Sequence, residues 1–170
     1  MSSVEFAAEP RHSDFPIEPM TVHDLLEVVE IEESCHLSLW GWDSYYAELS
    51  RPEAIMLVAR HALGADQLTR HQLYGFLSGR VSANELHINN IGVHEHARRR
   101  GVGRALMEAA ISVGKQQGAL TAILEVRAGN VAAQSLYRRY GFEVAGRRRQ
   151  YYREPVEDAL LMNAALKTRT

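Results

Sequence analysis

The stretch that decides the fold reads Ile91-Gly-Val-His-Glu-His-Ala-Arg-Arg-Arg-Gly-Val-Gly-Arg-Ala-Leu106. It passes from an apolar strand pattern, through a short basic turn, into a helical pattern. Gly101 and Gly103 allow a tight turn in which several backbone N–H groups point at one anion. The positive end of the helix dipole attracts the same anion. The stretch therefore predicts a pyrophosphate-binding turn, to which full charges are added by Arg98, Arg99, Arg100 and Arg104.

Two common phosphate-binding patterns do not fit this stretch. A nucleotide P-loop requires GxxxxGK[ST], and no Lys-Ser or Lys-Thr pair is present here. A dinucleotide-binding turn requires GxGxxG, and the third position after Gly103 is Leu106. What remains is the pattern Arg98-x-x-Gly101-x-Gly103. A basic loop that only caps the helix stays open as the alternative.

Hydrophobic periodicity divides the chain into strands and helices. Strands are predicted at residues 17–20, 54–59, 73–81, 85–93, 120–126, 142–145 and 158–165. Helices are predicted from a cap at Thr21 to residue 33, at 43–49, between Gly101 and Gly118, and at 131–140, with turns at 64–66 and 83–84. The order strand–helix–strand–helix–strand from 85 to 145 indicates an α/β fold, an α+β mixed sheet with a parallel element.

Length and composition favour one globular domain. The 170 residues can bury a substantial core, and we predict a flexible leader over 1–15 and a single domain over 16–170. No apolar run reaches the roughly 18 residues of a membrane span, and the start lacks a signal-peptide pattern. A single cysteine, Cys35, excludes an internal disulfide and fits a reducing cytosol. We expect a cytoplasmic protein in which Cys35 is a small buried residue rather than a nucleophile.

The net charge of −2 hides a strong asymmetry. Residues 91–153 hold 12 Lys/Arg against 4 Asp/Glu, whereas the rest of the chain holds 7 against 17. One part of the surface therefore suits an anion and the other a cationic partner. We assign the arginines of the basic part to helix starts and ends.

A second signature follows downstream, where a strand pattern leads to an Asn, a helix bearing a Tyr, and a Gly-Phe pair. These positions are Asn130, Tyr137, Gly141 and Phe142. Together with Arg98-x-x-Gly101-x-Gly103, this order resembles the GCN5-related N-acetyltransferase (GNAT) superfamily. Within it, the chain is similar to ribosomal-protein alanine N-acetyltransferases through Leu124-Glu-Val-Arg-Ala, Arg149-Gln-Tyr-Tyr152 and Glu157-Asp-Ala. The resemblance covers about residues 17–166.

The resemblance implies a fold and a cosubstrate. The GNAT fold has a mostly antiparallel central sheet flanked by helices, with a parallel fourth and fifth strand that splay apart around acetyl-CoA. The backbone at Val93 would polarise the thioester carbonyl, and the basic turn would hold the pyrophosphate. The residues implied to contact acetyl-CoA are Ile91, Val93, Arg98, Arg99, Arg100, Gly101, Val102, Gly103, Arg104, Ala105, Asn130 and Tyr137. For Asn130, capping of the following helix is a compatible second role.

The resemblance also implies direct attack by an amine, without a covalent acetyl-enzyme. Glu125 would act as general base, directly or through water, and Tyr137 as general acid toward the departing thiolate. Each has a structural alternative. Glu125 could pair with Arg127 or another arginine, and Tyr137 could be a packed core phenol.

The acceptor implied by the resemblance is a peptide α-amine. A free α-amine has a pKa near 8 and lysine one near 10.4, so the α-amine is more often neutral at pH 7. The residues expected on the acceptor side are Trp40, His87, Asn89, Tyr151 and Tyr152, with His87 as a possible second base. Asn89 and Gly92 depart from the family pattern. The favoured partner is a bacterial ribosomal protein that begins with alanine.

Other functions stay open on the sequence alone. A small amine, such as a polyamine, amino sugar or antibiotic, could be the acceptor. Arg147-Arg-Arg149 with the two tyrosines could bind RNA, and an acyl-CoA sensor would need no turnover. We expect no nucleic-acid or membrane partner, and a monomer or homodimer. We expect no metal either, since His94-x-His96 has no further ligand at a recognisable spacing.

Overall fold

The computed structural model describes residues 15–61 and 73–166. Within them one seven-stranded sheet has the order β1-β2-β3-β4-β5-β7-β6. Its strands are β1 (Ile17–Pro19), β2 (Ala54–Arg60), β3 (Leu73–Ser82), β4 (Glu85–Val93), β5 (Thr121–Arg127), β6 (Glu143–Arg153) and β7 (Val156–Ala165). All neighbours are antiparallel except β4 and β5, which are parallel. The predicted mixed sheet is confirmed.

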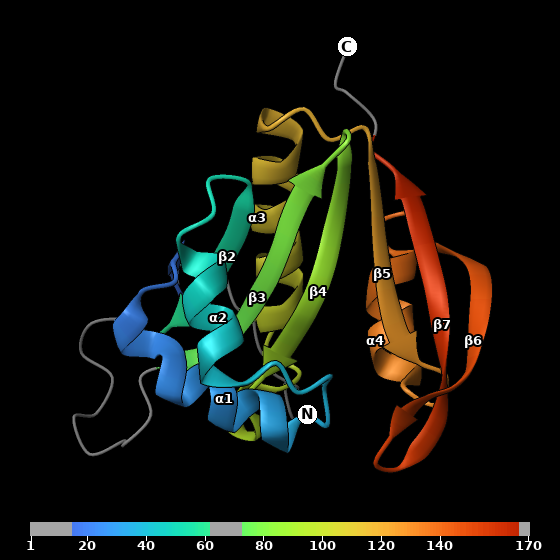
Figure 1. Cartoon of the computed structure of the whole chain (residues 1–170), viewed down its shortest axis with the longest axis horizontal. Coiled ribbons are helices and arrows are strands. Elements are labelled where there is room, and N and C mark those ends of the chain that lie inside the picture. The colour runs from blue at the N-terminus through green and yellow to red at the C-terminus, as the bar shows by residue number, and fades with distance from the viewer. Residues whose placement is uncertain (1–14, 62–72, 167–170) are drawn as a thin grey trace, which may run out of the picture.

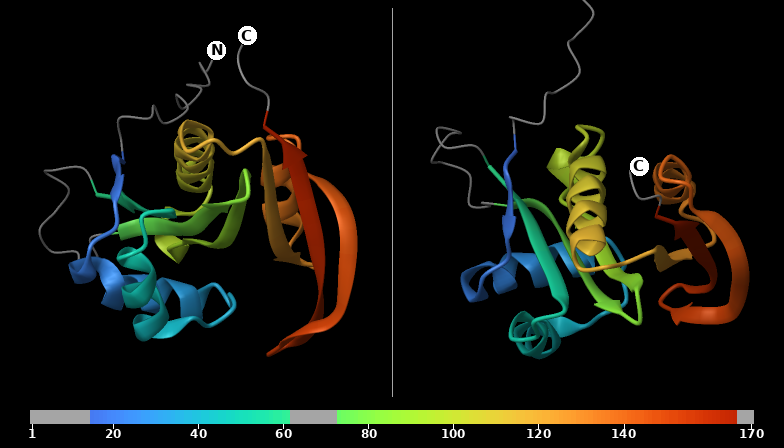
Figure 2. Two further views of the ribbon diagram at one scale, coloured as in Figure 1. Left: turned by 45° about the horizontal axis from the view of Figure 1, so that its top comes forward. Right: turned by 90° about the horizontal axis from the view of Figure 1, so that it is seen from above.

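Helices cover both faces of this sheet. They are α1 (Leu25–Ser34), α2 (Gly41–Leu49), α3 (Val102–Gln116) and α4 (Val131–Arg138), with two 3₁₀ turns, η1 (Val22–Asp24) and η2 (Glu95–Ala97). Figure 2 shows α1 and α2 on one side of the first four strands and α3 on the other. Two apolar clusters follow this division, one under α1 and α2 and one under α3 and α4.

The sheet opens between β4 and β5. The two strands pair only from Glu85–Ile88 against Thr121–Leu124. Beyond these pairs they diverge, and Figure 1 shows the β1–β4 half and the β5–β7–β6 half leaning apart toward the end that carries the start of α4. The splay that the resemblance implies is therefore present.

The end of the chain differs most from the prediction. A strand at 142–145 was expected, but β6 extends to Arg153 and pairs with a β7 that begins at Val156 rather than at 158. Arg147-Arg-Arg149 lies on this strand, so its assignment to a helix end was wrong. The length of this strand was not predicted because β6 is an exposed edge strand with two register shifts and a left-handed residue, Gln150 (φ 50°). Such a strand has no clean alternation of apolar and polar residues.

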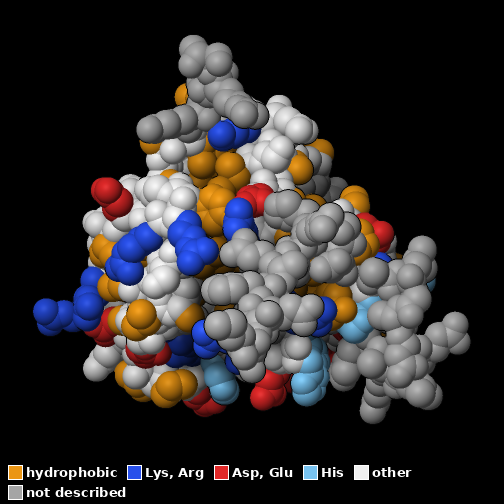
Figure 3. Space-filling view, turned by 180° about the vertical axis from the view of Figure 1, so that it is seen from behind, with side chains coloured by type: hydrophobic (Ala, Val, Ile, Leu, Met, Phe, Trp, Pro, Cys, Tyr) orange, Lys and Arg blue, Asp and Glu red, His pale blue; other side chains and the backbone are white. Residues whose placement is uncertain are grey.

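The remaining differences are small. The second helix begins at Gly41 rather than 43, and α4 ends at Arg138 rather than 140. Residues 1–14 of the leader predicted over 1–15, and the turn at 64–66, lie outside the described residues, so the domain boundaries stay a prediction. Among the described residues, no helix is long and apolar enough to cross a membrane. Viewed from behind, basic side chains gather on the half that carries α4 and β6 (Figure 3).

Candidate active site

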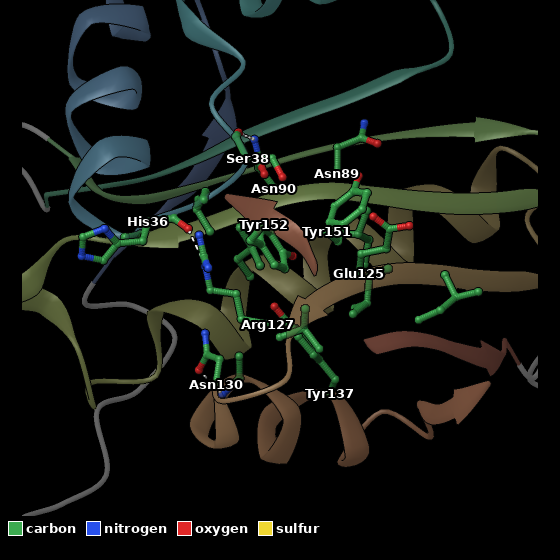
Figure 4. A pocket seen from close by; sticks show the side chains of 18 of the residues that line it. His36, Ser38, Asn89, Asn90, Glu125, Arg127, Asn130, Tyr137, Tyr151 and Tyr152 are labelled. Carbon is green, nitrogen blue, oxygen red and sulfur yellow. Dashed lines mark hydrogen bonds between the residues drawn. The ribbon is translucent and has the colours of Figure 1, made fainter. Parts of the chain in front are cut away.

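A cavity of about 360 Å³ lies at the opening between β4 and β5. Its walls come from the segment joining α1 to α2, the end of β4, β5, the start of α4 and β6 (Figure 4). The structure brings into this cavity all the residues predicted for catalysis and the acceptor, together with two of those predicted for acetyl-CoA, Ile91 and Asn130. They are Trp40, His87, Asn89, Ile91, Glu125, Asn130, Tyr137, Tyr151 and Tyr152.

The end of β4 presents backbone groups to the opening. The N–H of His94 donates to the carbonyl of Tyr74 on β3 at 2.7 Å. Hydrogen bonding alternates along an antiparallel strand, so Ile91 and Val93 direct their N–H and C=O groups away from β3. The Val93 carbonyl indeed accepts from the other side, from Arg98 Nε at 3.3 Å and Cys35 Sγ at 3.4 Å. The exposed backbone edge fits a pantetheine arm, which carries amide groups of its own.

The two glycines of the basic turn are required for different structural reasons. Gly101 caps α3 with a left-handed backbone (φ 85°), which a side chain would strain. Gly103 lies inside the helix, where an added Cβ would approach Leu136 Cδ2 of α4 to 3.2 Å. The first glycine therefore makes the turn, and the second lets α3 and α4 pack closely.

The start of α3 leaves three backbone N–H groups without an acceptor inside the helix. The N–H of Ala105 already donates to the Gly101 carbonyl at 3.0 Å. The N–H groups of Val102, Gly103 and Arg104 precede this first helical bond and have no intrahelical acceptor. A helix start of this kind fits a phosphate, and the binding of a pyrophosphate at this place stays a prediction.

The four arginines of the turn diverge rather than converge. Arg98 contacts Val93 and Cys35, Arg100 lies over the Tyr74 ring at 4.9 Å, and Arg104 pairs with Glu108 at 3.0 Å. Arg99 is exposed with a left-handed backbone (φ 62°). None of them lines the cavity described above. Their contact with a phosphate stays a prediction.

Glu125 projects from β5 into the cavity and is held by β6. Arg148 Nε lies 2.8 Å from its Oε1, and the side chains are 58% and 24% exposed respectively. The Tyr151 hydroxyl donates a hydrogen bond to Glu125, which is the main reason why the pKa of Tyr151 is raised. Glu125 is therefore paired with Arg148, whereas the neighbouring Arg127 pairs with Glu157. Partial exposure leaves one side of the carboxylate open to the cavity.

Tyr137 and Asn130 come from α4. Asn130 caps the helix by accepting from the Ala133 N–H at 3.1 Å. Tyr137 lines one side of the cavity, and only 5% of the residue is exposed. Burial, with a smaller effect of Tyr152, raises the pKa of Tyr137. The phenol thus stays protonated at neutral pH and can donate a proton.

The acceptor side is built around a bulge in β4. Ser78 pairs with Asn90 and Gly79 with Ile88, so Asn89 has no partner on β3. Within the described parts of the chain, the buried Nδ2 of Asn89 has no hydrogen-bond partner. A buried amide without a partner is costly, and a carbonyl oxygen would satisfy it.

The other predicted acceptor residues have contacts of their own. His87 Nε2 lies 2.7 Å from Glu85 Oε1 at the exposed rim. Tyr151 and Tyr152 form an edge-to-face pair, with ring centroids 5.2 Å apart. Trp40 packs against Tyr45 at the start of α2. Trp42, the other tryptophan of this segment, stacks on Tyr46 and does not line the cavity.

Several cavity residues were not predicted as site residues. Arg127, Arg148 and Asn90 line the cavity, and so does Cys35, which is half-buried rather than buried. The arginines were visible in the sequence, but their direction depends on the long-range pairing of β5, β7 and β6. Among the described residues, no group of three or more His, Cys, Asp and Glu could hold a metal ion.

Comparisons with known proteins agree with this geometry. The acetyltransferase (GNAT) family model matches residues 25–142. A putative ribosomal protein bS18-alanine N-acetyltransferase of Bacillus subtilis is 33% identical over 144 residues, covering 84% of this chain and 90% of that protein. The ribosomal protein bS18-alanine N-acetyltransferase of Salmonella typhimurium is 32% identical over 146 residues, covering 84% and 92%.

A solved structure extends the similarity to the fold. The crystal structure of the ribosomal-protein-S18-alanine N-acetyltransferase from Escherichia coli aligns with a TM-score of 0.75 and 28% identity. The alignment covers 92% of this chain and 96% of that one. The similarity thus includes both walls of the opening between β4 and β5.

Proposed function

The chain belongs to the GNAT family and is an acetyl-CoA-dependent N-acetyltransferase, and we propose that its acceptor is the α-amine of a protein that begins with alanine. The favoured acceptor is ribosomal protein bS18, which the names of its relatives specify for those proteins. Because that substrate belongs to the ribosome, the reaction takes place in the cytoplasm.

The observation that carries this proposal is a carboxylate and a buried phenol lining one cavity at the splay. The acceptor enters as the neutral amine, and Glu125 accepts, directly or through water, the proton that the nitrogen loses as its lone pair attacks the thioester carbon. The N–H of Val93, on the exposed edge of β4, donates to the carbonyl oxygen of the thioester. Tyr137, which burial keeps protonated, donates its proton to the departing thiolate.

The charges around Glu125 favour an α-amine over a lysine side chain. Arg148, 2.8 Å from the carboxylate, disfavours a second cation at the same place. An α-amine, with a pKa near 8, enters as the neutral form more often than lysine, with a pKa near 10.4. The cavity therefore selects for the acceptor that loses its proton more easily.

The acceptor wall also offers groups for a peptide backbone. Asn89 lines this wall, and its buried amide nitrogen has no partner in the described residues, so a turn of the side chain toward the opening would supply a donor for a peptide carbonyl. Tyr151 and Tyr152 line the same cavity with their rings nearly perpendicular to each other (Figure 4). A polyamine or an amino sugar has no backbone carbonyl to accept from Asn89, so the wall suits a peptide better than a small amine.

Thiol release from acetyl-CoA with a panel of acceptors tests the acceptor class. The panel holds peptides that begin with Ala, Ser or Met, an N-blocked lysine peptide, and spermidine. We expect the Ala peptide to have the highest kcat/KM and the lysine peptide and spermidine the lowest. Higher kcat/KM for spermidine or the lysine peptide would overturn the α-amine assignment and leave the acetyltransferase fold in place.

A further inference from the structure

We propose that Arg127 is a positioning residue that sets the width of the acceptor opening, because its guanidinium joins the α1–α2 segment to the β6–β7 hairpin. This inference rests on the proposed function for its effect on acceptors. The joining itself is a property of the structure that can be measured without any acceptor.

The guanidinium of Arg127 contacts both walls at once. Its Nε donates to the carbonyl of His36, on the α1–α2 segment, at 2.9 Å (Figure 4). On the hairpin side, its Nη2 donates to the carbonyl of Glu154 at 3.2 Å. Its Nη1 donates to the carbonyl of Pro155 at 3.1 Å and contacts Glu157 Oε2 at 3.3 Å.

The chemistry of arginine suits this task. A guanidinium carries its donors in a rigid plane, so one side chain can bind carbonyls in several directions. The Arg127 side chain is only 14% exposed, although its bonds to the three carbonyls lie at the surface. A lysine would keep the charge but has a single nitrogen, which cannot reach both walls in the same geometry.

The same guanidinium also orients Tyr152. Its carbon atom lies 4.1 Å from the centroid of the Tyr152 ring, within the range of a cation–π contact. Tyr152 lines the acceptor cavity. A change at residue 127 therefore moves an acceptor-side ring as well as the two walls.

Other hydrogen bonds also hold the α1–α2 segment in place. Arg127 adds the connection between this segment and the β6–β7 hairpin. The carbonyl of Ser38 accepts from Asn90 Nδ2 at 3.2 Å, and the N–H of Trp40 donates to Glu32 at 2.8 Å. The backbone is thus held at residues 36, 38 and 40 by side chains from β5, β4 and α1. Asn90 and Glu32 hold this wall against the β1–β4 half of the sheet. Arg127 contacts it from the β5–β7–β6 half.

Arg127→Gln and Arg127→Lys test the proposal, with Arg147→Gln as the matched control. Arg147 also joins β6 to β7, through Asp158 at 2.9 Å, but it does not line the cavity. Amide hydrogen exchange is measured over residues 35–40 and 151–157, alongside steady-state kinetics with the Ala peptide and acetyl-CoA. Thermal unfolding shows whether each variant is folded. If Arg127→Gln is not folded, Arg127→Lys is used for the test.

Faster exchange in both segments in the Arg127 variants, with little change in α3, is the expected result. The KM for the peptide should rise about tenfold, the scale of one charge-assisted hydrogen bond, with kcat and the KM for acetyl-CoA nearly unchanged. Arg147→Gln should change neither the exchange rates of these two segments nor the KM for the peptide. Faster exchange in the hairpin alone, or in neither segment, overturns the proposal.

Kinetics separate a failure of the joining role from a failure of the proposed function. If the parent protein acetylates no peptide, the acceptor assignment is wrong, and the exchange result still decides whether Arg127 joins the walls. If the parent is active and kcat falls while the peptide KM stays constant, Arg127 acts on the chemical step and the positioning role is refuted.

Discussion

At the scale of single residues, Glu125 and Tyr137 occupy opposite electrostatic environments within one cavity. Glu125 is partly exposed, and its Oε1 lies 2.8 Å from Arg148 Nε. Tyr137 is almost fully buried, and burial raises its pKa, so the phenol keeps its proton. The carboxylate is thus open to an incoming amine, and the phenol holds the proton that its proposed role requires it to donate.

Removing either group should slow the chemical step more than it weakens binding. We expect Glu125→Gln and Tyr137→Phe each to lower kcat by about 10²–10⁴-fold, with acetyl-CoA affinity retained. Glu143→Gln, an exposed carboxylate on β6 outside the cavity, is the control and should keep full activity. Single-turnover acetyl transfer gives the rate. A rate within threefold of the parent in either variant would remove that residue from the mechanism.

At the scale of elements, α3 depends on a left-handed glycine at each end. Gly101 begins the helix with φ 85° and Gly118 follows its end with φ 91°, and a Cβ on either would meet little within 4 Å. Alanine should cost about 1–2 kcal/mol of unfolding free energy at both positions, because both need the left-handed backbone.

Only the first of these glycines adjoins the proposed phosphate site. Gly101→Ala should raise the KM for acetyl-CoA severalfold, because it shifts the N–H groups at the start of α3, whereas Gly118→Ala should leave that KM unchanged. Urea unfolding and initial-rate kinetics on both variants provide the comparison. An equal rise in KM for both would mean that the effect comes from stability rather than from the turn.

Elements with local signals were predicted well from the sequence, and elements that depend on distant pairing were not. The turn at Gly101 and the cap at Asn130 follow from residue types within a few positions of each other. The length of β6 and the bulge at Asn89 depend on strands from elsewhere in the chain. The Arg148–Glu125 pair is a consequence of that long β6, so the sequence showed the carboxylate but not its partner.

At the scale of the whole molecule, a partly buried ion pair links the beginning of the described chain to the sheet. Arg60 of β2 contacts Asp24 through two bonds of 2.9 and 3.0 Å, and Thr21 adds bonds from its N–H and hydroxyl. Burial alone would raise the pKa of Asp24, but the hydrogen bonds from Arg60 and Thr21 outweigh burial and lower it.

This pair should make global stability sensitive to acid. A carboxylate whose pKa is lowered by folding adds stability above its unfolded-state pKa of about 3.9, and that stability is lost as the pH falls through the folded-state value. The unfolding free energy should therefore drop between pH 5 and pH 2, and less steeply in Asp24→Asn. Urea unfolding across this range, with the exposed Asp43→Asn as control, measures the slope. Equal slopes in Asp24→Asn and the parent would contradict the linkage.

The central claim is transfer of an acetyl group to the α-amine of an N-terminal alanine. Tandem mass spectrometry of a bS18 protein that begins with alanine, after incubation with acetyl-CoA and this enzyme, tests it most directly. The account predicts one added acetyl group on the α-nitrogen of that alanine, and none when Glu125→Gln replaces the parent. Acetyl groups found only on lysine side chains, or on no site while a small amine is acetylated rapidly, would contradict it.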